Sequence, residues 1–232
     1  MDSTVYLAIG SVALIAAPIV LTYRFEKHMV CHFGEPQAQP LSRDPYMHFC
    51  LADATRAGFS FLGWSRDLRG GVYKVSHALL VSPDRTTIAV VTTGFLMVPI
   101  RGVCLYTPTV DGRAFFTTNS QNFAEMDLSR NWTNHLALEA TVPKLWQRHQ
   151  AWLQKMAVSP RTFERKGHEL EDFCAVREEH YRSMARAGLI SYIDPSATQW
   201  RYTLRGAIRT AAWGFFVALM RKITRGRFPR NA

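Results

Sequence analysis

Residues 72–93, VYKVSHALLVSPDRTTIAVVTT, decide the fold class. They hold two apolar runs rich in β-branched residues, separated by Ser82-Pro83-Asp84-Arg85, and such runs are typical of strands. A connection this short joins only antiparallel neighbours, because parallel strands need a long crossover. The same pattern predicts strands at Phe59–Ser65, Val72–Ser82, Thr86–Thr93, Leu96–Thr107 and Arg113–Asn119. Sequential strands with short connections predict an antiparallel sheet of about five strands.

Helical patterns flank this predicted sheet. Asp44 is a suitable N-cap for a helix over Pro45–Ala57, with proline at its first position. After the sheet, an apolar stripe at helical spacing is interrupted by Pro143. Either a helix that starts well before Pro143 kinks there, or the helix begins at Thr141-Val142 with Thr141 as its cap, and we favour the later start. We therefore expect an α+β fold in which flanking helices pack the antiparallel sheet.

The N-terminal stretch Ser3–Tyr23, STVYLAIGSVALIAAPIVLTY, holds 21 residues without a charge. About 20 apolar residues in a helix cross the roughly 30 Å hydrocarbon core of a bilayer. A cleaved signal peptide is the first alternative, but it expects a basic segment before the run, where this chain has only Asp2. A buried core helix is the second alternative, and it usually has a polar face that this run lacks. We interpret Ser3–Tyr23 as a retained transmembrane anchor.

The charges beside the anchor give it a direction. Arg24 and Lys27 directly follow the run, so the positive-inside rule places the main domain in the cytoplasm of a single-pass protein of the cell membrane. The four cysteines show no metal-binding or C-x-x-C spacing and are interpreted as free thiols of a reducing compartment. They are Cys31, Cys50, Cys104 and Cys174.

These patterns divide the chain into five parts. We expect a transmembrane anchor at residues 1–23, a juxtamembrane helix and linker at 24–43, and an α+β sheet domain at 44–157. A helical extension follows at 158–200, with a long helix over Glu164–Ala187 that Gly188 ends. Residues 201–232 form a basic extension, read as a helix over Thr198–Arg225 and a tail. The juxtamembrane helix is expected over Arg24–His32.

The basic charge is concentrated in the C-terminal extension. The chain has a formal net charge of +10, and residues 201–232 contain eight of its 28 Lys and Arg side chains and no acidic residue. Their apolar run Thr210–Met220 is too short to cross a bilayer, since 11 helical residues span only about 16 Å. Three interpretations remain for this segment: a helix at the membrane interface, a buried helix with a solvated tail, or a nucleic-acid-binding tail.

We favour the membrane interface for this extension. Arginine and lysine side chains would contact anionic lipid headgroups while aromatic side chains insert. The N-terminal anchor would keep the extension close to the bilayer and raise its effective concentration there. A nucleic-acid partner is the least favoured interpretation, and a protein partner stays open. The predicted interface residues are Arg205, Arg209, Trp213, Phe215, Phe216, Arg221, Lys222 and Arg225.

No catalytic motif stands out. The chain has neither G-x-G-x-x-G nor the P-loop sequence, which argues against dinucleotide and P-loop nucleotide binding. His28, Cys31 and His32 are spaced to share a helical face, but their spacing matches no strong metal site, so we predict no metal and no cofactor. The leading hypothesis is a membrane-tethered binding or scaffold module. The alternative is a membrane-bound enzyme whose site gathers scattered His, Asp and Arg residues, and the positions of His77, His135 and His149 distinguish the two.

Overall fold

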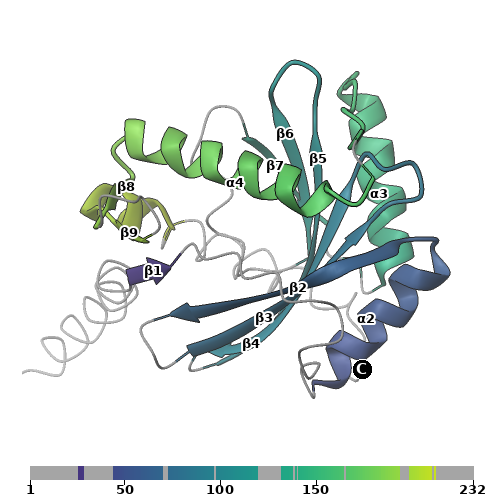
Figure 1. Ribbon diagram of the computed structural model, residues 1–232, viewed down its shortest axis with the longest axis horizontal. Coiled ribbons are helices and arrows are strands. Elements are labelled where there is room, and N and C mark those ends of the chain that lie inside the picture. The colour runs from purple at the N-terminus through teal and green to yellow at the C-terminus, as the bar shows by residue number, and fades with distance from the viewer. Residues whose placement is uncertain are drawn as a thin grey trace, which may run out of the picture.

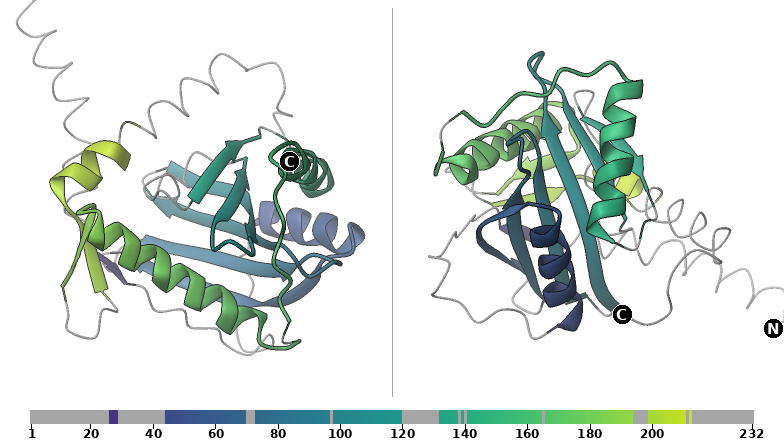
Figure 2. Two further views of the ribbon diagram at one scale, coloured as in Figure 1. Left: turned by 90° about the horizontal axis from the view of Figure 1, so that it is seen from above. Right: turned by 90° about the vertical axis from the view of Figure 1, so that its right-hand side faces the viewer.

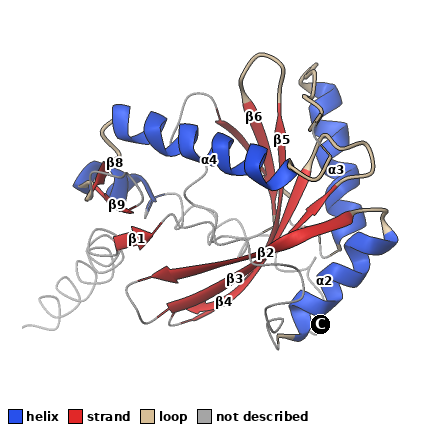
Figure 3. Cartoon of the chain, viewed as in Figure 1, coloured by secondary structure: helices blue, strands red, loops and turns tan. Residues whose placement is uncertain are grey.

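The computed structural model describes residues 26–28, 44–69, 73–96, 98–119, 132–137, 139, 141–164, 166–193, 199–210 and 212. In chain order the elements are β1 (Glu26–His28), α2 (Pro45–Arg56), β2 (Ser60–Arg69), β3 (Tyr73–Val81), β4 (Ile88–Leu96), β5 (Val98–Pro108), β6 (Ala114–Thr118), β7 (Trp132–Leu136), α3 (Val142–Lys155), α4 (Glu169–Arg186), β8 (Ile190–Tyr192) and β9 (Gln199–Tyr202). A further helical segment covers residues 204–210. The fold is α+β, as predicted (Figure 3).

The strands form one mixed sheet in the order β7-β6-β5-β4-β3-β2-β1-β9-β8 (Figure 1). β2 to β6 are sequential antiparallel neighbours, which confirms the predicted antiparallel sheet over that part. β7 adds a parallel pair at the β6 edge, while β1, β9 and β8 extend the opposite edge. The estimate of about five strands is therefore wrong, since nine described strands lie in the sheet. β1, β8 and β9 have only three or four residues each, too few for an alternating pattern to be recognised.

Both faces of the central sheet are buried. Ala78 and Leu80 of β3 belong to a cluster with α2 and α3, whereas Leu79 and Val81 belong to a second cluster with α4. Successive strand residues point to opposite faces, so the continuous apolar runs supply two cores at once. Figure 2 shows α4 on one side of the sheet and α2 and α3 on the other. The expected sheet domain ends at residue 157. Phe173 of α4 lies after that boundary and packs in the same apolar cluster as residues of the strands.

α3 begins at the later of the two predicted starts. It covers Val142–Lys155, with Thr141 as N-cap and Pro143 in the first turn. The Thr141 side chain makes no capping hydrogen bond. The carboxylate of Asp53, a buried residue of α2, caps the start of α3 instead. Its Oδ2 accepts a hydrogen bond from the Val142 N–H at 3.2 Å. Residue 53 therefore joins the two helices on this face of the sheet.

α4 begins at Glu169 rather than at the predicted Glu164. Gly167 has a φ of +89°, a conformation that glycine adopts without the steric cost of a Cβ, and it separates residue 164 from the helix. The buried Glu169 carboxylate accepts a hydrogen bond from the Gly167 N–H at 2.8 Å and pairs with Arg85 at 2.7 Å. The ion pair holds the start of α4 against the β3–β4 turn.

Two predicted helices are corrected in part. Residues 26–28, inside the expected Arg24–His32 helix, form strand β1. Residues 199–202, inside the expected Thr198–Arg225 helix, form β9. In β9, Trp200 and Tyr202 are buried and Arg201 between them is exposed, which is the alternation of a strand. Helical structure begins only at residue 204.

The expected anchor Ser3–Tyr23 lies outside the described residues. None of the helices in the described part of the chain combines the length and the apolar character that crossing a membrane requires.

Replacing Asp53 with alanine should lower the free energy of unfolding by about 1–2 kcal/mol, because the buried Val142 N–H loses its acceptor. Asp53 also pairs with Arg56 at 2.8 Å, whose side chain is 70% exposed. Arg56→Ala removes this pair alone and should cost no more than about 1 kcal/mol. Urea unfolding followed by circular dichroism measures both variants. Equal losses would show that the ion pair, and not the helix cap, stabilises the protein.

Candidate functional site

A cleft of about 280 Å³ opens between α4, the end of the β5–β6 hairpin and the segment 158–163. Its floor includes the ring of Tyr106 from β5. Charged and polar side chains surround this floor from three parts of the chain. They are Arg113 from the hairpin, Arg161 from the segment, and Asp172, Glu179, His180 and Ser183 from α4.

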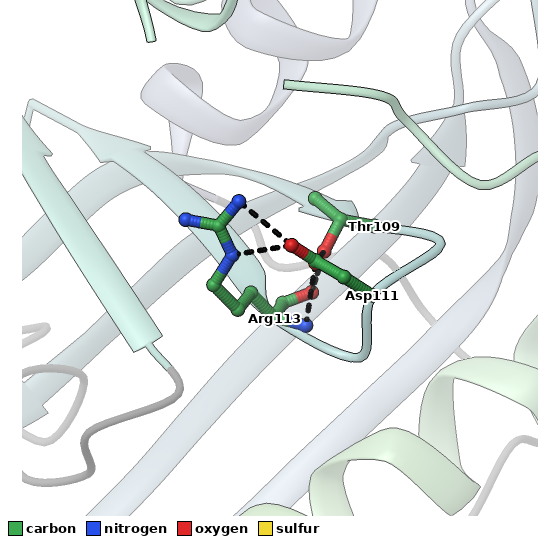
Figure 4. A network of polar contacts seen from close by, with 3 residues as sticks. All are labelled: Thr109, Asp111 and Arg113. Carbon is green, nitrogen blue, oxygen red and sulfur yellow. Dashed lines mark hydrogen bonds and ion pairs between the residues drawn. The ribbon is translucent and has the colours of Figure 1, made fainter. Parts of the chain in front are cut away.

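The hairpin turn holds Arg113 in place (Figure 4). The Nε and one terminal nitrogen of Arg113 each lie 2.7 Å from Oδ2 of Asp111. The other Asp111 oxygen accepts from the Arg113 N–H at 3.3 Å and from the Thr109 hydroxyl. The Thr109 hydroxyl, then the Arg113 backbone and side chain, lower the pKa of Asp111. Because both ends of the turn bond to one carboxylate, the Arg113 guanidinium is positioned before any ligand arrives.

The segment 158–163 adds to the hairpin like a short strand. Arg161 N–H donates to the Pro108 carbonyl at 2.8 Å, and Val110 N–H donates to the Ser159 carbonyl at 3.2 Å. Pro160 forms a bridge with Thr109 between these bonds. The backbone of Arg161 is therefore fixed at the cleft, while its side chain is exposed.

Tyr106 of the floor and His180 of the helical wall are buried. The Tyr106 ring contacts Phe116 and Phe173, with ring centroids 4.9 and 5.3 Å apart. Burial raises the pKa of Tyr106, and the charge of Arg161 acts against that rise. On α4, burial and then the charge of Arg177 lower the pKa of His180 to about 3. His180 is therefore neutral near pH 7 and adds no charge to the cleft.

His149 lies in the core and not in this cleft. Its side chain is 0% exposed, and its Nε2 and Nδ1 lie 2.8 and 2.7 Å from the hydroxyls of Thr107 and Thr117. A neutral imidazole donates through one ring nitrogen and accepts through the other, and a hydroxyl can do either. Both ring nitrogens thus have hydrogen-bond partners, which supports a packing role for His149.

His77 and His135 also pack against neighbouring side chains of the fold. His77 on β3 is buried, and its Nδ1 lies 2.9 Å from the Thr92 hydroxyl. His135 lies half-buried on β7, and its ring is 4.9 Å from that of Trp152. None of the three lines the cleft.

Of the eight predicted interface residues, the structure describes Arg205 and Arg209, and both are exposed. The other six, Trp213, Phe215, Phe216, Arg221, Lys222 and Arg225, lie outside the described residues. Beside the two arginines, Leu204 is 58% exposed and Ile208 is 47% exposed. These four residues line one shallow surface depression, called here the 204–209 face.

The opposite side of this helix is packed tightly against the domain. Ala207 is buried, and a Cβ on Gly206 would lie 1.9 Å from the Leu189 carbonyl oxygen. Only glycine fits this approach, which directs the 204–209 face outward. β9 precedes the helix and pairs with β1, with Glu26 opposite Arg201.

Among the described residues, no group of three or more His, Cys, Asp or Glu side chains is placed to hold a metal ion. Of the predicted cluster His28, Cys31 and His32, the structure describes only His28, on β1. Cys50, Cys104 and Cys174 form no disulfide bonds, and burial raises the pKa of Cys50 to about 12. Cys31 lies outside the described residues.

Comparisons of the chain with protein-family models, with curated proteins and with solved structures find no match.

Sequence reasoning missed the cleft. Asp111-Gly112 is typical of a hairpin turn, but nothing in the sequence places α4 across the end of that hairpin. Arg161 follows Ser159-Pro160, which reads as a simple chain break. The cleft arises from packing between segments more than 60 residues apart, such as Arg113 and Ser183.

The buried His149 should make stability fall in acid. Burial is the main cause that lowers its pKa from 6.5 to about 3, so below pH 6.5 the unfolded chain binds a proton that the folded protein excludes. Stability is full above pH 6.5 and is lost as the pH falls toward 3, by at most about 1.4 kcal/mol per pH unit from this residue. Urea unfolding of the wild type and His149→Gln between pH 7 and 4 measures this slope.

His149→Gln should reduce the slope of the unfolding free energy against pH by up to the contribution of one proton. The buried His180 should contribute a pH dependence that remains in this variant. His48→Gln is the matched control, since His48 is exposed on α2, and it should leave the slope unchanged. A slope in His149→Gln equal to that of the wild type would contradict the assignment.

Proposed function

We propose that this protein is a membrane-tethered binding or scaffold module that contacts one membrane face at two neighbouring points. The first point is the apolar run Ser3–Tyr23, and the second is the 204–209 face with the basic sequence that follows it. The β1–β9 pairing is the observation that carries the proposal. Glu26, three residues after the run, lies opposite Arg201, three residues before Leu204.

Strand direction strengthens this argument. β1 and β9 are antiparallel, so the N-terminal end of β1 lies beside the C-terminal end of β9. The connection from Tyr23 to Glu26 and the connection from Arg201 to Leu204 therefore meet the strand pair at the same end. Three residues extend at most about 11 Å. The end of the apolar run and the start of the 204–209 face are thus held near one another by covalent reach and one strand pair.

The 204–209 face has the chemistry that an anionic bilayer surface recognises. Leu204 and Ile208 are four residues apart on one helical stripe, and so are Arg205 and Arg209. Basic residues close to an anionic membrane contribute about 1 kcal/mol each. The sequence continues with Trp213, Phe215 and Phe216 and then Arg221, Lys222 and Arg225, which suit the same interface. Arg24 and Lys27 favour the cytoplasmic side, where anionic lipids are concentrated.

The packing of the histidines favours binding over catalysis. An enzyme built on His77, His135 or His149 needs an imidazole with a free ring nitrogen near a cleft. Threonine hydroxyls instead contact both ring nitrogens of His149 and one of His77.

If the apolar run anchors the chain, the full-length protein expressed in cells should stay in the membrane pellet after alkaline carbonate washing. Leu14→Arg combined with Ile15→Arg should release it, since each arginine at the centre of a membrane helix costs about 2.5–3.5 kcal/mol. Arginine substitutions at Lys144 and Lys155, exposed on α3, control for expression. Retention of the doubly substituted chain would contradict anchoring by this run.

If the 204–209 face contacts lipid, hydrogen exchange in peptides covering residues 203–212 should slow when the full chain is reconstituted in vesicles containing phosphatidylserine. Vesicles of phosphatidylcholine alone should give little protection. Arg205→Glu with Arg209→Glu should abolish the difference, because it reverses the local charge.

Lys144→Glu with Lys155→Glu is the matched control, because it changes the net charge equally on the other side of the sheet. It should preserve the protection. Equal exchange in both lipid compositions would contradict the proposed second contact, while the carbonate experiment tests the first contact separately.

A further inference from the structure

The cleft between α4 and the β5–β6 hairpin contains one arginine that forms no ion pair with the described residues. Arg113 is paired with Asp111 at 2.7 Å. Glu179 is paired with Arg186 on α4. Arg161 has no ion-pair partner among the described residues, although its backbone is fixed by the bond to Pro108. A ligand that carries one negative charge can form an ion pair with Arg161.

The carboxylates of the lining restrict how much negative charge such a ligand can carry. Asp172 and Glu179 line the same cleft from α4. Like charges at close range repel, so a multiply charged anion would meet both arginines but also both carboxylates. His180 is neutral near pH 7, because burial lowers its pKa to about 3, and does not offset this repulsion. The charge pattern therefore favours a monoanion.

Part of the lining is apolar and suits an uncharged organic body. Pro108 and Ala114 contribute from the hairpin, and Ala175 and Val176 contribute from α4. The hydroxyl group of Ser183 lies in the same lining and can donate a hydrogen bond to an oxygen anion. Convergent polar groups within an apolar surface are typical of small-molecule sites.

The size of the cleft limits the ligand to a small one. Its volume of about 280 Å³ lies just below the roughly 300–1,000 Å³ of most small-molecule sites. A single ring or a short chain fits such a volume. A polymer or a nucleotide does not.

We propose that this cleft binds a small organic monoanion, with its carboxylate on Arg161 and its apolar body against Ala114, Ala175 and Val176. Arg113, held by Asp111, borders the same opening. The inference goes beyond membrane attachment and does not depend on it, because the cleft and the 204–209 face share no residue.

Benzoate is a suitable probe, since it combines one carboxylate with one apolar ring, and benzamide is its neutral counterpart of nearly the same shape. Ligand-observed NMR on the detergent-solubilised full chain should give saturable binding of benzoate and at least tenfold weaker binding of benzamide. Arg161→Gln should weaken benzoate binding at least tenfold, because it removes the charge while the backbone bond to Pro108 remains. Ala175→Leu should do the same by filling the apolar side.

Arg148→Gln is the matched control, because Arg148 is an exposed arginine on α3, paired with Glu139 at 3.1 Å. It should bind benzoate like the wild type, and so should Arg205→Glu with Arg209→Glu. Circular dichroism verifies that each variant is folded. No saturable benzoate binding, equal binding of benzamide, equal loss in Arg148→Gln, or tighter binding of inorganic phosphate than of benzoate would each overturn the proposal.

Discussion

The burial of both faces of β3, β4 and β5 is the constraint on which the rest of the structure depends. Each strand sends alternate apolar residues to opposite sides, so the sheet is stable only if both sides are covered. α2 and α3 cover one side through residues such as Met47 and Leu145. α4 covers the other, where Phe173 and Phe163 pack on the strands. Several polar groups buried with these side chains have local hydrogen-bond partners, as the threonine contacts of His149 illustrate.

The candidate site follows from the way α4 meets this constraint. Its first half packs on the sheet through Phe173, and its second half packs through Tyr181 and Met184 on β8 and β9. Glu179 and His180 lie where the helix passes from one apolar cluster to the next. At that point the β5–β6 hairpin approaches the helix and leaves a cleft. The ion pair of Arg85 with Glu169 fixes the start of the helix, and thereby the position of the helical wall of the cleft.

The sequence predicts the features that depend on local chemistry. The five strands of the antiparallel part, the helix capped by Asp44 and the start of α3 at Thr141 all follow from residue patterns and turn residues. It does not predict β1 and β9, because a strand of three or four residues forms only where a partner edge is available. It does not predict the cleft either. Arg113, Arg161 and His180 come from separate segments, and no local pattern indicates that packing brings them together.

The pairing of β1 with β9 joins the first and the last strand of the described chain. β1 lies between β2 and β9, and its register places Lys27 opposite both Arg69 and Trp200. A strand inserted between two others is held on both edges by backbone hydrogen bonds, whereas a free edge strand is held on one. Trp200 is itself buried against Tyr181 of α4, with ring centroids 4.9 Å apart. An apolar run that leaves the domain from β1 is thus attached at its exit to the packed core. If the apolar run attaches the chain to a membrane, as proposed, the position of β1 relative to that membrane also sets the position of β9, and through Trp200 that of α4.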